Sequence, residues 1–473
     1  MQVTLVGFVL IGLWVAAVFR GISATTYLTL LMVPLGAAAV INIPASGLSI
    51  LALQGLAALT TGIAVLQLLA TGRRNETGIP AAAWVLGLLC VYGVISAFAL
   101  PRLFFHDVLV VPYQRAIDGV RMSEIFFTTL IPLAPTSSNI SQPGYLLASF
   151  AFFLVMISVA RLKGAGYLSR ALLAAALLNA ALGFMDMLRL DFLLDFIRTA
   201  DYAIVADWSI LGTDRLIGGF PEPSAFGSVC AIFAAYGLSI FFDRNDWIAG
   251  GIGIANGFFA VMALSSTGWF GLVVLGSFLI LRTLFDIAVG GGGRRASIIM
   301  VLAFPVLVAI VAIIVLTPAG QYVMDMADRM IFSKGESASG LERGVWASEG
   351  FRVFRETFGF GAGLGSVRSN GIIPVILANV GWPGLVCAAV FMWLVFLKPT
   401  GLNRSASPET RNHRVLFRAS LAATITALAM MVTTAVLVDP GILFFAFAAI
   451  AVCVRPQPQR APAPRRRMVH AAR

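Results

Sequence analysis

Residues 207–242 read DWSILGTDRLIGGFPEPSAFGSVCAIFAAYGLSIFF, which joins a polar, turn-rich segment to a long apolar run. Proline is favoured in the first turn of a helix, because its missing N–H would be unpaired there anyway. Ser224 is a good capping residue, so we expect a membrane helix to begin within Pro221-Glu222-Pro223-Ser224, at the membrane surface. The free N–H groups and the positive dipole at that helix end favour an anion.

Arg215 lies a few residues before this expected helix start. An arginine beside a helix N-terminus is suited to hold a phosphate, and Gly218 and Gly219 allow the loop to fold back. A salt bridge from Arg215 to Glu222, on a well-capped helix, explains the same residues without a ligand. Taken alone, the stretch favours the salt bridge.

The chain as a whole has the composition of a polytopic membrane protein. Of its 473 residues 59% are hydrophobic and 12% are charged, the mean hydropathy is +0.92, and the apolar residues come in long runs. Soluble domains do not have this composition, so we expect an all-α fold of about 13 transmembrane helices, each crossing about 30 Å of hydrocarbon. The expected spans are 2–19, 25–43, 47–70, 81–100, 143–160, 170–186, 224–242, 247–264, 268–286, 296–317, 371–397, 417–437 and 440–454.

The basic residues predict the orientation, because lysine and arginine concentrate on the cytoplasmic side of a membrane protein. They favour a cytoplasmic C-terminus and three long extracytoplasmic segments, at 101–142, 187–223 and 318–370; a bacterial inner membrane is implied only by the family resemblance described below. The net charge of +11 therefore does not indicate nucleic acid: the tail is a disordered segment beside the anionic lipid bilayer.

Four regions follow from this pattern. We expect N-terminal transmembrane helices in 1–200, a core with the largest outer loop in 201–397, C-terminal helices in 398–454 and a disordered basic tail in 455–473. Long outer loops on a many-span body indicate chemistry or recognition at the outer face. A transporter more often places its polar groups in mid-membrane, and the expected spans hold few ionisable residues.

The 318–370 loop contains an expected helix over 341–357. Glu342, Glu349 and Glu356 are seven apart and share one face, where Arg352 has carboxylates three and four residues away. Arg343 points about 120° away from that stripe, which makes it the better candidate for binding a ligand.

A glycine-rich stretch, GFGAGLG at 359–365, follows this helix, and Arg368 comes after it, close to the membrane. Its backbone N–H groups are candidates for binding a phosphate or a sugar. A glycine-rich hinge without a ligand is equally compatible.

Three features together resemble the superfamily of O-antigen ligases and Wzy-type polysaccharide polymerases. They are the R-x-x-W spacing of Arg343 and Trp346, the stretch GFGAGLG followed by SNGIIPVILANVGWPG, and the arginine of RLIGGFPEPSAFG. The similarity covers roughly residues 205–395, and the earlier spans match only as membrane helices.

The resemblance implies a GT-C-like membrane glycosyltransferase that needs no metal or cofactor. Its donor would be an oligosaccharide on undecaprenyl diphosphate, its active site would face the periplasm, and family arginines would hold the diphosphate. Arg215 and Arg343 stand where two of these arginines are expected, and Arg368 is a third. Arg355 and Asn370 are further candidates for substrate binding.

The same resemblance separates two activities. The ligase branch has a histidine at the position of Asn370. Since asparagine cannot act as a general base, polymerisation of exopolysaccharide or O-antigen repeats is favoured over ligation. Arginines and a helix N-terminus would stabilise the leaving diphosphate. Glu222 is the first candidate catalytic residue, to orient or deprotonate the acceptor hydroxyl.

The alternatives come from other classes of protein. A ligase, a flippase or other transporter of lipid-linked oligosaccharide, and a structural partner of a secretion machine all stay open. A dolichol-type glycosyltransferase is disfavoured, because the first outer loop near Asn42 carries no acid. A flippase and a chain-length-regulating co-polymerase are the partners expected for a polymerase.

Overall fold

The computed structural model describes residues 2–43, 48–71, 78–113, 116–117, 120–121, 130–200, 209–210, 213–288, 338–398 and 407–455. The expected span 296–317 and most of the basic tail lie outside these residues. The elements are β1 Gln2–Val3, α1 Leu5–Val18, α2 Ile22–Leu31, β2 Ala39–Ile43, β3 Leu48–Leu51, α3 Ala52–Thr71, α4 Ala81–Leu103, β4 Leu109–Val110, β5 Ala116–Ile117, β6 Val120–Arg121, β7 Ile131–Pro132, α5 Ser138–Lys163, α6 Ala165–Met187, α7 Asp191–Ile197, β8 Ser209–Ile210, β9 Thr213–Asp214, α8 Pro223–Arg244, α9 Trp247–Met262, α10 Ser266–Ala288, α13 Ala338–Glu356, α14 Ile372–Met392, the π-helical turn η4 Trp393–Leu397, α15 Pro408–Thr434 and α16 Ile442–Cys453.

The described part of the chain is a bundle of apolar helices, as a multi-pass membrane protein requires. Eight of the described helices are long and apolar enough to cross a membrane: α3, α4, α5, α6, α8, α10, α14 with η4, and α15. Four further apolar helices, α1, α2, α9 and α16, have only 10–17 residues.

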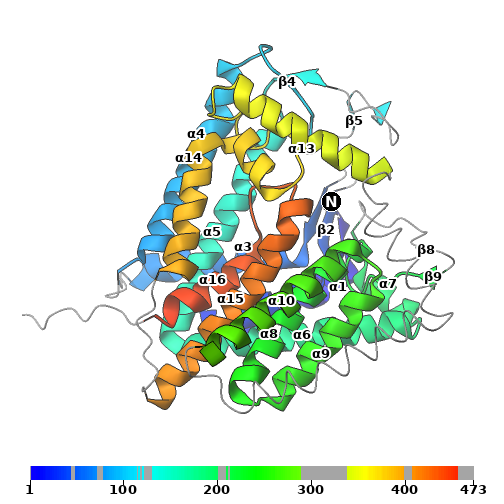
Figure 1. The fold of residues 1–473 in the computed structure, drawn as a ribbon, viewed down its shortest axis with the longest axis vertical. Coiled ribbons are helices and arrows are strands. Elements are labelled where there is room, and N and C mark those ends of the chain that lie inside the picture. Colours follow the sequence, from blue (N-terminus) through cyan, green and yellow to red (C-terminus); the bar gives the residue numbers. More distant parts are fainter. Residues whose placement is uncertain are drawn as a thin grey trace, which may run out of the picture.

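Helix α8 lies at the centre and packs against α9, α10 and α15 (Figure 1). Glycines let α8 and α9 approach closely: a Cβ added at Gly237 would lie 2.6 Å from the carbonyl oxygen of Ala249. Small residues are typical of helix contacts in membranes, where close packing replaces the hydrophobic effect. Buried amides join α6 to α9, since Asn179 donates to Asn256 at 2.8 Å.

Two expected spans differ from the structure. Only Ile22–Leu31 of the 25–43 region is helical, because Ala39–Ile43 forms the middle strand of an antiparallel β1-β2-β3 sheet. A short apolar run such as AVINI suits a strand as well as a helix, and its β-branched residues favour the strand. The span at 371–397 is interrupted at Gly381, where φ is +58° and ψ is −157°.

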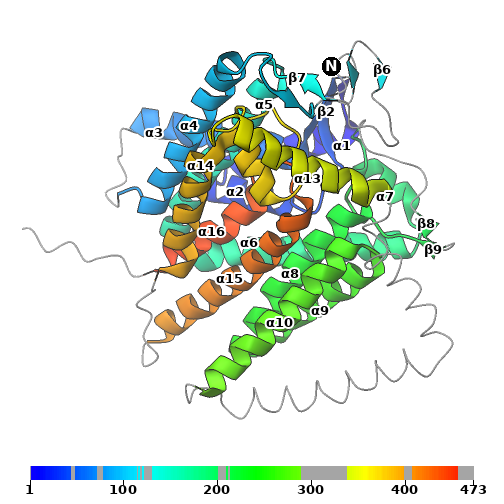
Figure 2. The ribbon, with the colours of Figure 1, turned by 45° about the horizontal axis from the view of Figure 1, so that its top comes forward.

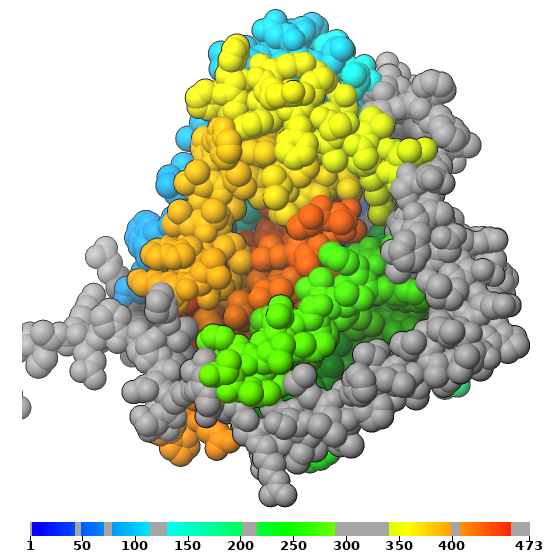
Figure 3. All heavy atoms as spheres, viewed as in Figure 1, coloured from blue at the N-terminus to red at the C-terminus, as the bar shows by residue number. Residues whose placement is uncertain are grey.

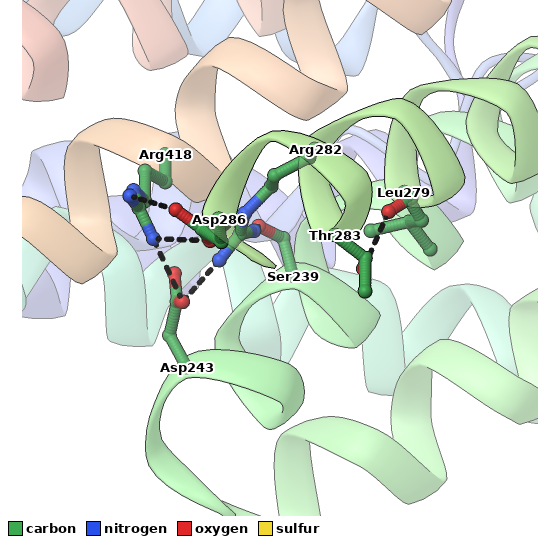
Figure 4. Close-up of polar contacts among 7 residues, drawn as sticks. All are labelled: Ser239, Asp243, Leu279, Arg282, Thr283, Asp286 and Arg418. Carbon is green, nitrogen blue, oxygen red and sulfur yellow. Dashed lines mark hydrogen bonds and ion pairs between the residues drawn. The ribbon is translucent and has the colours of Figure 1, made fainter. Parts of the chain in front are cut away.

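Helix α13 runs crosswise over one end of the bundle, in both views of the ribbon (Figures 1 and 2). We call this the α13 end: α4 and α15 finish there, and α5, α8 and α14 begin there. At the opposite end, Arg282, Arg418, Asp243 and Asp286 join α8, α10 and α15 in an ion-pair cluster (Figure 4).

Candidate functional site at the α13 end

Arg215 occupies the loop that leads into α8. Its side chain is half-buried, and its Nε–H donates to the carbonyl oxygen of Ala263 at 3.4 Å. Burial lowers the pKa of this guanidinium, and the neighbouring Glu222 carboxylate opposes that change. Among the described residues Arg215 has no ion pair, so the expected salt bridge to Glu222 is not formed.

Glu222 is the N-cap of α8, and the helix begins at Pro223. Its exposed carboxylate accepts a hydrogen bond from the hydroxyl of Ser224 at 2.7 Å. The prediction that Ser224 caps the helix was therefore wrong, because Ser224 lies inside the first turn and turns its hydroxyl back. Glu222 is open to solvent beside Arg215.

A clamp that the sequence did not reveal fixes this loop. The carboxylate of Asp186, at the end of α6, accepts the N–H groups of Ile217 at 2.7 Å and Gly218 at 2.9 Å. Arg198 pairs with the same carboxylate at 2.7 Å and donates to the carbonyl oxygen of Gly218. Asp186 and Arg198 belong to the expected outer segment 187–223 and its border, but only the fold shows which backbone groups they bind.

The helix expected over 341–357 is confirmed as α13, and so are the partners of Arg352. This arginine pairs with Glu349 at 2.7 Å and with Glu356, and it also donates to the carbonyl oxygen of Leu109. Arg343 is half-buried and forms no polar contact with any residue that the structure describes. Arg352 thus holds α13 in place, whereas Arg343 stays available for a ligand.

Arg368 is brought to the same face of α13. Its guanidinium lies 4.1 Å from the ring centroid of Trp346, which is buried. Residues three apart on a helix are neighbours on its surface, so Arg343 lies one turn from Trp346 and the stacked Arg368. The R-x-x-W spacing thereby gathers two of the three candidate diphosphate ligands.

The glycine-rich loop packs against α14, and several of its backbone N–H groups are bonded within the protein. The N–H groups of Ala362 and Gly363 donate to carbonyl oxygens of α14, and those of Gly365 and Val367 donate to the side chain of Asn379. A Cβ at Gly365, where φ is +89°, would lie 2.3 Å from the carbonyl oxygen of Ser138. The expectation that this backbone binds phosphate is therefore not met, since these groups are already bonded.

Asn370 joins this loop to the end of α15. Its side-chain amide donates to the carbonyl oxygen of Thr433 at 2.9 Å. Nearby, the hydroxyl of Tyr113 donates to the carbonyl oxygen of Val436 at 2.9 Å, and burial raises the pKa of this phenol although Arg368 opposes the change. Asn370 is thus a hydrogen-bond donor that fixes the loop on α15.

An apolar hollow opens below this junction, between α14 and α15 (Figure 3). Its walls come from five helices or their ends and include Ile372 and Ile376 near the start of α14, and Phe391 and Met392 near its end. Ile372, the first of these residues in the chain, lies two residues after Asn370.

Arg355 lies elsewhere. It is exposed in the last turn of α13, 12 residues after Arg343, which corresponds to about 18 Å along the helix axis. There it lines a separate open cleft with Phe358 and Asp107. The structure thus divides the predicted residues into three places: Arg215 with Glu222, Arg343 with Arg368 and Asn370, and Arg355 apart.

The three places share one end of the bundle. In both ribbon views the N-terminal end of α13 lies on the side of the molecule where α7 and the β8-β9 hairpin lie (Figures 1 and 2). Arg215 directly follows β9, so the half of α13 that carries Arg343 is turned toward the Arg215 loop. No protein-family model and no curated protein matches this chain in sequence comparisons.

Proposed function

We propose that this protein is a membrane glycosyltransferase that joins oligosaccharide repeat units carried on undecaprenyl diphosphate. The observation that carries the proposal is the apolar hollow between α14 and α15, which begins at the loop holding Arg368 and Asn370. A donor with a long apolar chain and a charged head needs such a pairing of an apolar groove with cations at one end. The α13 end would then face the periplasm of a bacterial inner membrane.

The chemistry assigns a role to each group. The polyprenyl chain would lie in the hollow, and Arg343 and Arg368 would bind the diphosphate from the face of α13. Arg215 would approach from the α8 side. Preorganised cations of this kind stabilise the negative charge that grows on the leaving diphosphate. Glu222, exposed beside Arg215, would orient the acceptor hydroxyl that attacks the anomeric carbon.

Polymerisation is favoured over ligation by Asn370. A ligase mechanism of the kind that the resemblance implies uses a histidine there, and an amide bonded to Thr433 cannot take a proton. The hollow is lined by apolar side chains throughout, which also favours a lipid chain over the hydrophilic cargo of a transporter. No step in this scheme requires a metal or cofactor.

A deletion strain tests the proposal directly. It should retain single repeat units on undecaprenyl diphosphate and lose long polymer, and the wild-type chain should restore the polymer. The same complementation with Arg343→Ala should restore little, at equal amounts of protein in the membrane. Accumulation of full-length polymer on undecaprenyl diphosphate in the deletion strain would indicate a ligase, and unchanged glycans would rule out both activities.

A further inference from the structure

The C-terminal end of α13 carries a second, open cleft that the scheme above does not use. It is formed where the end of α4 meets the end of α13 and the loop that follows. Three phenylalanine rings line it together with three charged side chains: Phe104, Phe358, Phe360, Asp107, Arg355 and Glu356. Aromatic walls with a few polar groups are typical of small-molecule sites.

Phe358 is exposed to an unusual degree. It is 82% exposed, and its backbone is left-handed with φ of +52°. A residue in this conformation directly after a helix is normally glycine, because a bulky side chain is strained there. Gly359 follows immediately and is also left-handed. At position 358 a glycine would form the turn with less strain, yet the chain has an exposed phenylalanine there. Such strain tends to persist at ligand sites.

Two of the three charges in the cleft are available, and the third, Glu356, pairs with Arg352. The carboxylate of Asp107 and the guanidinium of Arg355 form no hydrogen bond or ion pair within the described ranges, although both line the same cleft. Arg352, one turn earlier on α13, binds two glutamates and a backbone carbonyl. Another arginine of α13 can therefore form ion pairs, and Arg355 differs from Arg352 in having none among the described residues.

We propose that this cleft binds a sugar chain, and that it is the subsite for the acceptor glycan. The apolar C–H face of a pyranose packs on an aromatic ring such as Phe358, and carboxylate and guanidinium groups each present a fork that matches neighbouring hydroxyls. A phosphate is disfavoured because Asp107 and Glu356 would repel it. The role as acceptor subsite rests on the proposed function; the affinity for sugar does not.

The position fits a long acceptor. The cleft lies about 18 Å along α13 from Arg343, so a chain of several sugar units would reach from one to the other. Helix α13 would then set the distance between the bound acceptor glycan and the head group of the donor. This predicts that the cleft affects the binding of longer oligosaccharides more than that of monosaccharides.

Binding is tested with the purified full-length protein in lipid nanodiscs, using maltohexaose, cellohexaose, chitohexaose and mannohexaose as probes in saturation-transfer NMR. At least one hexasaccharide should bind, and Phe358→Ala and Arg355→Ala should each weaken it by about tenfold. Phe351→Ala is the matched control, since this exposed phenylalanine on α13 does not line the cleft. Binding that none of these substitutions changes, or no binding of any probe, would overturn the subsite.

The outcome is separable from that of the proposed function, because the binding measurement does not need glycosyl transfer. A protein that binds sugar through Phe358 but makes no polymer would refute only the polymerase. A polymerase whose chain length and sugar binding are indifferent to Phe358→Ala and Arg355→Ala would refute only the cleft. An aromatic ring that merely rests in the lipid interface would give this second result.

Discussion

Two groups of arginines, one at each end of the bundle, differ in their partners. At the opposite end, Arg282 and Arg418 share the carboxylates of Asp243 and Asp286, and Arg282 also donates to Ser239 at 3.1 Å. Figure 4 shows these side chains converging from α8, α10 and α15. Both arginines of this cluster are paired with carboxylates inside the protein, so the cluster fastens three helices together.

At the α13 end, Arg215, Arg343 and Arg355 are among the arginines that form no ion pair with a residue that the structure describes. The end is not short of carboxylates, since Arg198 pairs with Asp186 and Arg352 pairs with two glutamates. Arg215 and Arg343 are half-buried, and burial without a carboxylate disfavours a cation. This contrast is the reason for proposing that Arg215 and Arg343 bind an external anion, whereas the ion-pair cluster fastens helices together.

The largest expected effect comes from breaking the paired end. Asp243→Ala removes the more buried of the two carboxylates that Arg282 and Arg418 share and leaves only Asp286 to pair with both, which should destabilise the protein by about 3 kcal/mol. Thermal unfolding in detergent measures this as a clear fall in Tm. Glu409→Ala is the control, because this exposed carboxylate lies at the start of α15 at the same end. Equal melting of the two variants would contradict the role given to the cluster.

The second effect tests the unpaired end. Charged hydrogen bonds to phosphate contribute about 1.5–3 kcal/mol, so Arg343→Ala should reduce glycosyl transfer at least about tenfold. Its Tm should stay close to that of the wild type, because no described contact is lost. Lysine at this position keeps the charge but not the fork, and should restore activity in part.

Arg352→Ala is the reverse case and completes this test. It should lower the Tm, because Glu349, Glu356 and the carbonyl oxygen of Leu109 all lose a donor. Its activity per folded molecule should change less than that of Arg343→Ala. If the two variants lost the same share of activity at normal stability, Arg343 would have no special role.

A smaller effect concerns pH. The pKa of Tyr113 is raised above its ordinary value of 10.0 by burial, so the folded state keeps the phenol proton when the unfolded state loses it. Stability is therefore fully present below about pH 10 and falls as the pH rises above that value. Tyr113→Phe should remove this alkaline fall and cost about 1 kcal/mol at neutral pH, through the lost bond to Val436. An unchanged alkaline profile in urea titrations would exclude Tyr113 as its source.

The smallest effect should come from Trp346→Phe. Phenylalanine keeps a ring beneath Arg368 but attracts the cation less, at a cost of about 0.5–1 kcal/mol. We expect roughly a threefold loss of transfer, with a higher KM for the donor. A loss as large as that of Arg343→Ala would mean that Trp346 does more than position Arg368.

The helices were predictable where the sequence is long and apolar. The start of α8 and the extent of α13 are close to the prediction. The proline, the glutamate spacing and the hydropathy that predict them all lie within the helix or next to it. The strand at Ala39–Ile43 was missed because a run of five residues, four of them apolar, fits either structure, and the pairing with β1 and β3 decides between them. The pattern within these five residues carries no information about β1, whose paired residues lie 38 to 40 positions earlier in the chain.

The candidate site was only partly predictable for the same reason. That Arg352 is structural followed from spacing within one helix. The stacking of Arg368 on Trp346 and the clamp of Asp186 on Gly218 depend on segments far apart in sequence. Likewise, the sequence around Arg355 and Arg343 does not separate their roles. Arg355 lines its own cleft only because the end of α4 lies beside it. The roles of these residues in catalysis stay predictions.

Helix α16 has a consequence for how the chain enters the membrane. Its 12 residues correspond to about 18 Å, well short of the roughly 30 Å of hydrocarbon. It is preceded by Asp439, whose carboxylate is bonded to Ser149 of α5 and to the N–H of Gly441. An insertion machinery that releases helices one at a time would reject such a segment. We therefore expect α16 to insert only as a hairpin with α15, so that a reporter fused after α16 is integrated when α15 precedes it and is lost when α16 stands alone.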